Sequence, residues 1–394
     1  MNKAVLTLDV QDFINKNLNT NAAKIALAKS PFHEVSSAEL AAQIRAKKKS
    51  EKKLPTWFNT PCIFYPATLS IEQTSSEITA RYKASIVPGD TLIDITGGFG
   101  VDAYYFAAQN KEVVHCEINK ALSAIAQHNA QELQACNIVF LNKDGIEFVK
   151  QENAHWNTIY VDPARRGSTG KVFRLADCTP NIPEHLESLF AKTNRIILKT
   201  SPLLDIDAGL KELNYVKEIH VISIKNECKE LLWIMEPGFS GDLKITATTL
   251  NNQTKSFSFY KKDLKHLSSF AEKIVYGLFL YEPDAAILKA GVQDSIASLY
   301  HLNKLNTNTQ LFISKDIETD FPGRIFEIIK VMDTKEVKKK MNLQGNVVVR
   351  NYPAQAEELI KKYAIKPAKE QFLIFCKNSD EKNIVIEAKI IQYY

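Results

Sequence analysis

The chain has 394 residues, of which 45% are hydrophobic and 24% charged, a composition typical of a globular protein with two or three domains. The longest apolar run, 274–281, is far too short to span a bilayer, and the N-terminus lacks the apolar core of a signal peptide. The 6 cysteines are too widely spaced for a CxxC pair, which predicts reduced thiols in a cytoplasmic protein and no metal site.

Positive charge is concentrated towards both ends of the chain. Residues 1–65 hold 10 Lys and Arg against 5 Asp and Glu, and residues 330–370 hold the same numbers. Because the whole chain carries +5, the remainder sums to −5 by subtraction (5 − 10). Basic ends predict contact with a polyanion at the periphery. The alternative for the basic run at 45–53 is a solvated helix face or a linker.

The first 65 residues are predicted to be helical. Apolar residues recur at three- and four-residue spacing in 9–18, 21–30 and 36–53, with Asn, Ser or Asp near each start. The proline-containing segment 54–66 has no such period and is predicted to be a linker. Four aromatic residues are expected to pack this linker on the next domain: Trp57, Phe58, Phe64 and Tyr65.

From residue 74 onwards, strand and helix patterns alternate. Five short apolar runs are predicted strands, at 91–95, 112–118, 137–142, 158–162 and 195–200. Runs of this kind suit parallel strands that are buried on both faces. Two further runs, 218–224 and 230–235, are too close together for a crossover helix and predict an antiparallel hairpin.

The first strand ends in a glycine-rich turn, DITGGFG, at 94–100. Its glycines let the backbone approach a ligand closely, and the helix behind them offers free N–H groups. Gly98, Gly100 and Ala103 also fit the dinucleotide pattern G-x-G-x-x-A. Asp94 favours S-adenosylmethionine, because a carboxylate repels pyrophosphate but attracts a cationic amine and sulfonium. The alternative is a structural turn in which Asp94 caps the helix. The turn residues expected to bind the cofactor are Asp94, Thr96, Gly97, Gly98 and Gly100.

Acidic residues also follow the second and third strands. Glu117 can accept hydrogen bonds from both hydroxyls of a ribose, in NAD or in S-adenosylmethionine alike. Ile118 stands beside it as a further expected contact. Asp144, followed by Gly145, is placed to accept a hydrogen bond from an adenine amino group. The alternative for Asp144 is an ordinary turn aspartate.

Five parallel strands closed by an antiparallel pair resemble the class I S-adenosylmethionine-dependent methyltransferases. The resemblance covers 74–236 and implies an α/β fold with a Rossmann-like, seven-stranded sheet. The motifs EQTSSEITARYKAS, DITGGFGVD, VDPARR, NECKELL and YEPDAAILKAG together resemble a bacterial group of such enzymes that ends in a THUMP-like domain. This wider resemblance implies four parts: a helical region 1–65, a methyltransferase domain 66–237, a ferredoxin-like insert 238–280 and a THUMP-like α+β domain 281–394.

In the methyltransferase architecture, the end of the fourth strand faces the transferred group. Asp162 and Pro163 stand there, as in enzymes that methylate amino groups of nucleic acids, but no base-stacking aromatic residue follows. The sequence DPAR is nearer the DPPR of RNA uracil-C5 methyltransferases. Those enzymes need a cysteine nucleophile after the fifth strand, and LKTSP at 198–202 has none. We therefore expect direct methyl transfer to nitrogen or oxygen, with Asp162 and Pro163 as the catalytic positions.

Substrate contacts are expected around this position. Arg165 and Arg166 can bind a phosphate or a base edge, and surface salt bridges are the alternative. Lys199 lies near the end of the fifth strand, and the turn after the sixth strand, which holds Asn226 and Glu227, is expected to overhang the pocket. Phe64 and Tyr65 of the linker are further candidates for holding the target.

The resemblance also implies a substrate class. True THUMP domains bind RNA, commonly tRNA, so RNA is the expected partner and modification of tRNA or rRNA is the leading hypothesis. Two alternatives stay open: a methyltransferase that acts on a protein or small molecule, and a non-catalytic RNA-binding module with a vestigial nucleotide site.

Overall fold

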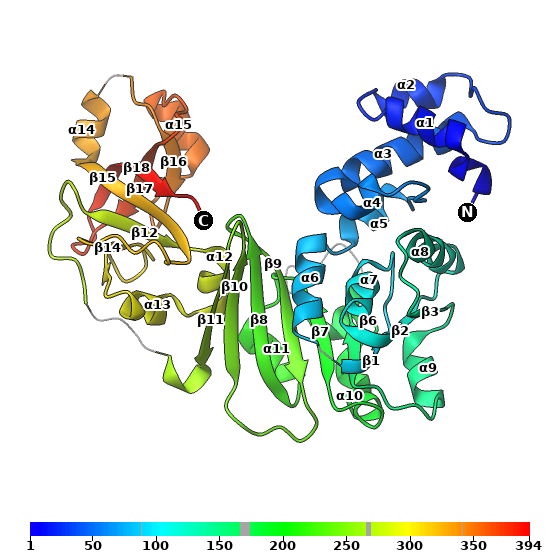
Figure 1. Cartoon of the computed structure of the whole chain (residues 1–394). Coiled ribbons are helices and arrows are strands. Elements are labelled where there is room, and N and C mark those ends of the chain that lie inside the picture. The colour runs from blue at the N-terminus through cyan, green and yellow to red at the C-terminus, as the bar shows by residue number, and fades with distance from the viewer. Residues whose placement is uncertain (88, 166–173, 265–268, 341) are drawn as a thin grey trace. The chain divides into compact units, whose positions relative to one another are not determined.

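The computed structural model describes residues 1–87, 89–165, 174–264, 269–340 and 342–394 (Figure 1). The chain divides into two compact units. The first unit comprises 1–217 and 232–240, and the second comprises 218–231 and 241–394. Strand β9 (Glu227–Met235) contributes residues to both units.

The N-terminal region is helical, as its periodicity predicts. It contains η1 (Lys3–Leu6), α1 (Leu8–Lys16), α2 (Ala22–Leu27) and α3 (Ser37–Lys53). Ser36 and Glu39 form a capping box at the start of α3, which satisfies N–H groups that would otherwise lack partners. The helices pack around an apolar cluster that includes Val10, Ile14 and Leu40.

The segment expected to be a linker is partly helical and tightly packed. It contains α4 (Pro55–Asn59) and is followed by α5 (Thr68–Gln73) and α6 (Glu77–Ser85). Trp57 is 1% exposed, and its ring centroid lies 5.0 Å from that of Tyr104 in the first helix of the next domain. The side chain of Asn129 accepts the N–H of Phe64 and donates to its carbonyl, each at 2.9 Å. These contacts attach the segment to the next domain, as expected of its aromatic residues.

The first unit is built on a parallel sheet with strand order β7-β4-β1-β2-β3. The strands are β1 (Gly89–Asp94), β2 (Asn110–Cys116), β3 (Ile138–Leu141), β4 (Thr158–Val161) and β7 (Ile196–Thr200). The connecting helices are α7 (Val101–Ala107), α8 (Lys120–Glu132), α9 (Gly145–Gln151), α10 (Ile182–Phe190) and α11 (Ile206–Glu212). A short pair, β5 (Ala164–Arg165) and β6 (Cys178–Thr179), follows β4. Because parallel strands end at one edge, the predicted site residues meet there.

The expected antiparallel hairpin is present. Strand β8 (Val216–Ile224) neighbours β9, and Lys225 and Asn226 join them with φ of 51° and 60°. Two central residues with positive φ are typical of a type I′ hairpin turn. Two more strands, β10 (Lys244–Leu250) and β11 (Thr254–Tyr260), continue from β8, which β10 pairs in parallel. Within the described residues, the large sheet therefore has nine strands, whereas seven were expected.

The second unit contains a seven-stranded sheet of its own with the order β13-β14-β12-β15-β18-β17-β16. Its strands are β12 (Phe279–Pro283), β13 (Asn303–Lys304), β14 (Phe312–Ser314), β15 (Gly323–Asp333), β16 (Asn346–Val349), β17 (Gln371–Lys377) and β18 (Asn383–Gln392). Its helices are α12 (Ala285–Ala290), α13 (Gln293–Leu299), α14 (Thr334–Lys339) and α15 (Ala356–Tyr363), and a short η3 (Lys261–Asp263) precedes them.

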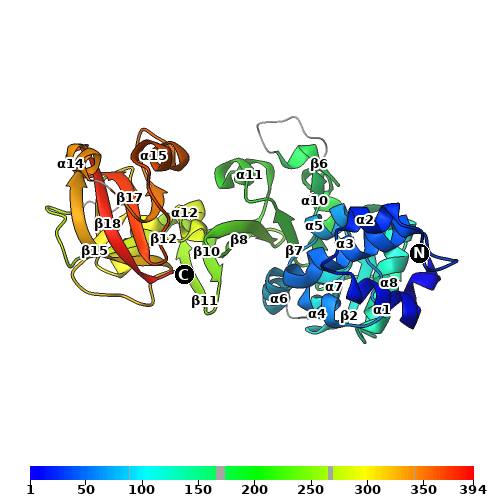
Figure 2. The same ribbon diagram turned by 90° about the horizontal axis from the view of Figure 1, so that it is seen from above.

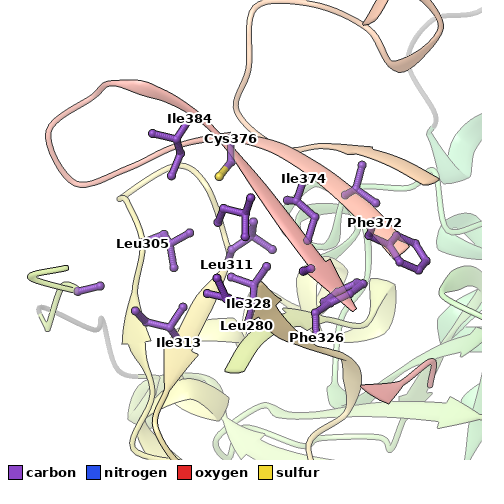
Figure 3. Close-up of a cluster of buried hydrophobic side chains, with 14 of the residues drawn as sticks. Leu280, Leu305, Leu311, Ile313, Phe326, Ile328, Phe372, Ile374, Cys376 and Ile384 are labelled. Atoms are coloured by element: carbon purple, nitrogen blue, oxygen red, sulfur yellow. The ribbon is translucent and has the colours of Figure 1, made fainter. Parts of the chain in front are cut away.

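Two apolar clusters form the core of this sheet. One contains Leu280, Phe326 and Ile374, and Figure 3 shows these side chains together. The other contains Val337 of α14 and Leu359 of α15, so both helices cover the same face, as Figures 1 and 2 also show. Burial of apolar side chains on both faces is the main source of stability for a sheet of this kind.

Candidate cofactor and acceptor site

The glycine-rich turn has a conformation that side chains would disturb. Gly98 and Gly100 have φ of 56° and 83°, in the left-handed region that favours glycine. A Cβ atom at Gly97 would lie 2.3 Å from Nε2 of His115, which is fully buried beneath the turn. The turn can therefore take this shape only because residue 97 has no side chain. The sequence analysis did not single out His115, since nothing in strand β2 distinguishes it from a core residue.

Asp94 lies at the end of β1, directly before the turn. Its side chain is 1% exposed and accepts hydrogen bonds from the backbone N–H of Thr96 at 2.9 Å and from the Thr96 hydroxyl at 3.3 Å. Burial raises the pKa of Asp94 well above its usual value, and the nearby Asp102 and Asp162 raise it further. Asp94 does not cap the following helix, because the N-cap of α7 is Gly100 without a side-chain bond. This excludes the structural capping alternative.

Glu117 connects the end of β2 to the glycine turn. Its Oε2 accepts the backbone N–H of Gly98 at 2.9 Å, and its Oε1 accepts that of Asn119 at 2.7 Å. Each oxygen keeps one lone-pair direction for a further donor. The next side chain, Ile118, is 72% exposed and offers an apolar surface beside the carboxylate. Asn142, which the sequence analysis did not name, donates to the carbonyls of Glu117 and Ile118 at 2.8 and 2.9 Å and fixes their backbone.

Asp144 and Gly145 begin α9 at the same edge of the sheet. Asp144 is the N-cap, and its Oδ1 accepts the backbone N–H of Glu147 at 3.1 Å. A Cβ atom at Gly145 would lie 2.3 Å from the carbonyl oxygen of Ile95, so glycine permits the helix to approach the end of β1. Asp144 is therefore a helix cap, a structural role close to the turn aspartate that the sequence left open.

The ends of β4 and β7 bring Asp162 and Lys199 together. The Lys199 ammonium lies 2.5 Å from Oδ2 of Asp162, with side-chain exposures of 15% and 30%. The backbone N–H of Asp162 donates to the Thr96 hydroxyl at 2.7 Å, which connects β4 to the turn. Pro163 follows and is half-buried. The sequence analysis named Asp162 and Lys199 separately, and the fold makes them an ion pair.

A second ion pair lies buried beside Asp94. Lys83 of α6 contacts the carboxylate of Asp102 of α7 at 2.9 Å, and the hydroxyls of Ser75 and Tyr160 donate to the same carboxylate at 2.8 and 3.0 Å. Burial opposes the ionisation of Asp102, yet the ammonium groups of Lys83 and Lys199 hold its pKa below the usual value. The sequence analysis missed this group because its members come from segments that lie far apart in the chain.

Comparisons with known proteins agree with this arrangement. Over 99% of its length the chain is similar to a crystal structure of a "putative methyltransferase" from Porphyromonas gingivalis W83, with a TM-score of 0.86, 27% sequence identity and 99% of that chain covered. Residues 279–322 match a ferredoxin-like domain family, and 323–389 match a THUMP domain-like family. The chain has a methyltransferase fold and a THUMP-like domain.

Two curated relatives are similar over shorter stretches. An uncharacterized S-adenosylmethionine-dependent methyltransferase of Mycobacterium tuberculosis is 22% identical over 238 residues, which cover 60% of this chain and 62% of that protein. An uncharacterized RNA methyltransferase of Mycoplasma mobile is 30% identical over 86 residues, which cover 22% and 24%. The chain thus spans less than two thirds of the length of these curated relatives. They support S-adenosylmethionine as the cofactor and methyl transfer as the enzyme activity.

The matched domains start later than the sequence analysis expected. The ferredoxin-like match covers 279–322, whereas the insert was placed at 238–280. Strands β10 and β11 occupy much of that earlier segment and extend the large sheet. The THUMP-like match covers 323–389, within the expected 281–394. Strands β10 and β11 pair antiparallel, and their polar sequence carries no signal that would assign them to one sheet over another.

Several expected substrate contacts have other roles. The side-chain oxygen of Asn226 accepts the N–H of Ala285 at 2.8 Å, and Glu227 pairs with Lys229 at 2.6 Å. Both lie in the second unit, and the substrate contacts expected of them stay predictions. Tyr65 is 2% exposed and its hydroxyl donates to the carbonyl of Trp57 at 2.9 Å, so it cannot stack on a target base. Arg165 belongs to β5, and Arg166 lies outside the described residues.

Two further features of the described residues concern membrane-spanning helices and groups of metal-binding side chains. Across the described ranges, no helix is both long and apolar enough to cross a membrane. The same residues contain no group of three or more His, Cys, Asp or Glu side chains that could hold a metal ion.

Proposed function

We propose that the chain transfers a methyl group from S-adenosylmethionine to RNA by direct attack of a nitrogen or oxygen atom. The observation that carries this proposal is the group of carboxylates around the glycine turn. The carboxylate of Asp94 accepts the Thr96 hydroxyl at 3.3 Å, and the backbone N–H of Asp162 donates to the same hydroxyl at 2.7 Å, so the two acids stand on either side of one turn residue. Such a site repels the two phosphates of a dinucleotide and favours a ligand with positive charge. S-adenosylmethionine carries a cationic amine and a cationic sulfur.

The remaining residues of the site fit the same cofactor. Glu117 can accept both ribose hydroxyls while it keeps its bonds to the Gly98 and Asn119 N–H groups. The exposed Ile118 side chain provides an apolar surface for the adenine ring. The backbone of Thr96, Gly97 and Gly100 would line the methionine moiety. Oδ2 of Asp144, the oxygen that does not cap helix α9, is the candidate acceptor for the adenine amino group. Gly145 has no side chain that would obstruct the adenine ring.

The reaction needs little more than correct placement. When bound, the cofactor supplies a methyl group on a positively charged sulfur, which a nucleophile can attack directly. The protein must bring the acceptor into line and exclude water. Asp162 is placed to contact the acceptor, since it ends β4 and its backbone is held by Thr96. Pro163 fixes the backbone angle that follows.

RNA is the proposed substrate because three observations favour a polyanion. The THUMP-like match, the basic stretch 330–370 and the name of the Mycoplasma relative all favour it. The other basic stretch carries less weight. Lys48 pairs with Glu51 at 2.9 Å, Lys49 pairs with Glu72 at 2.7 Å, and Lys47 is buried. The run at 45–53 is thus largely a helix face with internal partners, which favours the alternative considered from the sequence.

The proposal is tested with radiolabelled S-adenosylmethionine and two acceptor pools, total RNA and total protein from cells that lack the protein. We expect label in RNA alone. Label in protein alone would favour the rival substrate class. No label in either pool, with no binding of S-adenosylhomocysteine by calorimetry, would contradict the enzyme assignment.

A further inference from the structure

The ion pair between Asp162 and Lys199 indicates the chemical nature of the acceptor. It lies at the ends of adjacent strands β4 and β7, where the acceptor must approach. Oδ2 of Asp162 accepts from Lys199, while Oδ1 has no hydrogen-bond partner among the described residues. Asp162 is the more exposed of the two side chains, at 30% against 15%. A basic oxygen and a fixed cation therefore stand side by side at the acceptor position.

The two charges suit one class of nucleophile better than another. A neutral amine, or a ring nitrogen without a hydrogen, gains positive charge as it takes a methyl group, and a neighbouring ammonium opposes this change. A hydroxyl, or a ring N–H, must instead lose its proton and gains negative charge. Such an acceptor uses both partners, because the carboxylate takes the proton and the ammonium stabilises the developing anion.

Among the side chains that the structure describes, the other charges near Asp162 do not replace Lys199 in this role. Asp94 and Asp102 are acids, and the ammonium of Lys83 is committed to Asp102 within the buried network. Lys199 is thus the cation placed beside Asp162 in the described part of the first unit, and its charge also reaches Asp102. A site made only to receive an amine needs hydrogen-bond acceptors and gains nothing from this ammonium.

We infer that Asp162 and Lys199 act as a unit on an acceptor that must give up its proton before or while it attacks the methyl group: a ribose hydroxyl, or the ring N–H of guanine or uracil. This inference rests on the proposed function and specifies its substrate. The acceptor atom forms a bond to the methyl carbon, and the carbon–sulfur bond breaks with its electron pair left on sulfur. The acceptor proton passes to Oδ1 of Asp162, and Lys199 holds the charge that builds up on the acceptor.

The first test identifies the product. RNA from cells that lack the protein is incubated with protein and labelled S-adenosylmethionine, digested to nucleosides and separated by chromatography with mass detection. A 2′-O-methyl nucleoside supports the inference and identifies the ribose, and 1-methylguanosine or 3-methyluridine supports it and identifies the base. Label in N6-methyladenosine, N2-methylguanosine, 7-methylguanosine or 1-methyladenosine overturns the inference and leaves the proposed function standing. Absence of label from RNA overturns the proposed function itself.

The second test separates the two residues from their surroundings. We expect Lys199→Met to lower kcat by about a hundredfold or more, with the affinity for S-adenosylhomocysteine within about threefold by calorimetry. Lys199→Arg, which keeps the charge, should retain at least about a tenth of kcat. The matched control is Lys217→Met, which removes an ion pair between Lys217 of β8 and Glu236, the residue after β9. The inference is overturned if Lys199→Met turns over at nearly the normal rate, or if Lys199→Arg is as impaired as Lys199→Met while both bind the cofactor product.

Discussion

The backbone N–H of Asp162 donates to the hydroxyl of Thr96 at 2.7 Å, so one side chain of the glycine turn holds the end of the neighbouring strand. The same hydroxyl contacts the carboxylate of Asp94 at 3.3 Å. Thr96 therefore connects the residue proposed to attract the cofactor with the residue proposed to contact the acceptor. Four of the following predictions concern this first unit.

Replacement of Thr96 by valine should impair cofactor binding and turnover together. Valine keeps the shape but removes the hydroxyl, and leaving the Asp162 N–H without its partner costs about 1 to 3 kcal/mol. We expect the affinity for S-adenosylhomocysteine, measured by calorimetry, to fall about tenfold or more. Thr96→Ser keeps the hydroxyl and serves as the control. Equal affinities for the two variants would show that the hydroxyl does not connect the two sites.

Glu117→Ala should weaken cofactor binding by about ten- to a hundredfold, because it removes a charge-assisted contact to the ribose. Calorimetry with S-adenosylhomocysteine measures the loss, and no binding of NAD is expected for either protein. Glu112→Ala is the control, since Glu112 is an exposed residue of the same strand. Tight NAD binding by the unaltered protein would contradict the cofactor assignment.

The buried His115 should make stability depend on pH. Burial lowers the pKa of His115 from 6.5 to about 4, so the folded protein keeps the ring neutral where the unfolded chain protonates it. Above pH 6.5 the ring is neutral in both states, and the free energy of unfolding has its full value. As the pH falls from 6.5 towards about 4, the free energy of unfolding decreases by about 3 kcal/mol in all. Urea unfolding at a series of pH values measures this loss. In His115→Leu the same pH interval should show a smaller change, and an unchanged slope would contradict the assignment to His115.

Gly97→Ala should destabilise the turn, because its Cβ atom would lie 2.3 Å from the His115 ring. Overpacking of this kind typically costs about 1 to 3 kcal/mol. Because the turn is proposed to bind the cofactor, Gly97→Ala should also lower the affinity for S-adenosylhomocysteine. The double variant Gly97→Ala, His115→Ala removes the obstructing ring and should recover part of that affinity. A double-mutant cycle on unfolding free energy and on S-adenosylhomocysteine binding measures the coupling. Additive losses would show that the two residues do not interfere.

The helices of the THUMP-like domain should carry part of the RNA contact. The lysines concerned are exposed on α14 and α15: Lys338, Lys339, Lys361 and Lys362. If each contacts a phosphate, their joint replacement by alanine should reduce the slope of log affinity against log salt by about 3. Filter binding of tRNA over a salt series provides the measurement.

The control for this experiment is the pair Lys48→Ala, Lys49→Ala, because these lysines already have acidic partners within the chain. The control should bind RNA with the original salt dependence. A loss in the control that equals the loss in the α14 and α15 variant would assign RNA binding to the N-terminal helices instead.

The strands themselves and the position of the strand-end acids could be predicted from the sequence because both depend on local patterns. Alternating apolar runs fixed the parallel strands, and Asp94, Glu117 and Asp162 each stand where a strand ends. The partners of these acids could not be predicted, since they depend on which segments the fold brings together. Lys83 has an ordinary place in a helical pattern, and only the packing of α6 on α7 makes it a buried partner of Asp102.

The same limit explains contacts that the sequence did not indicate. Asn226 was expected at the substrate because of its place after a strand, and the N–H at the start of helix α12 donates to its side-chain oxygen. Tyr65 was expected to pack on the next domain and was also a candidate for holding the target. Trp57 and Gln43 instead enclose it, and burial raises the pKa of its hydroxyl.

The two hydrogen bonds between Asn129 and the backbone of Phe64 have a consequence for dissecting the protein. Helix α8, which carries Asn129, starts three residues after Glu117, and Trp57 of the same N-terminal segment covers Tyr104 on α7. A fragment that starts at residue 66 would leave these aromatic and amide groups facing water. The first 65 residues therefore pack as part of the first unit and do not form a separable segment. An expression fragment of this unit should retain them.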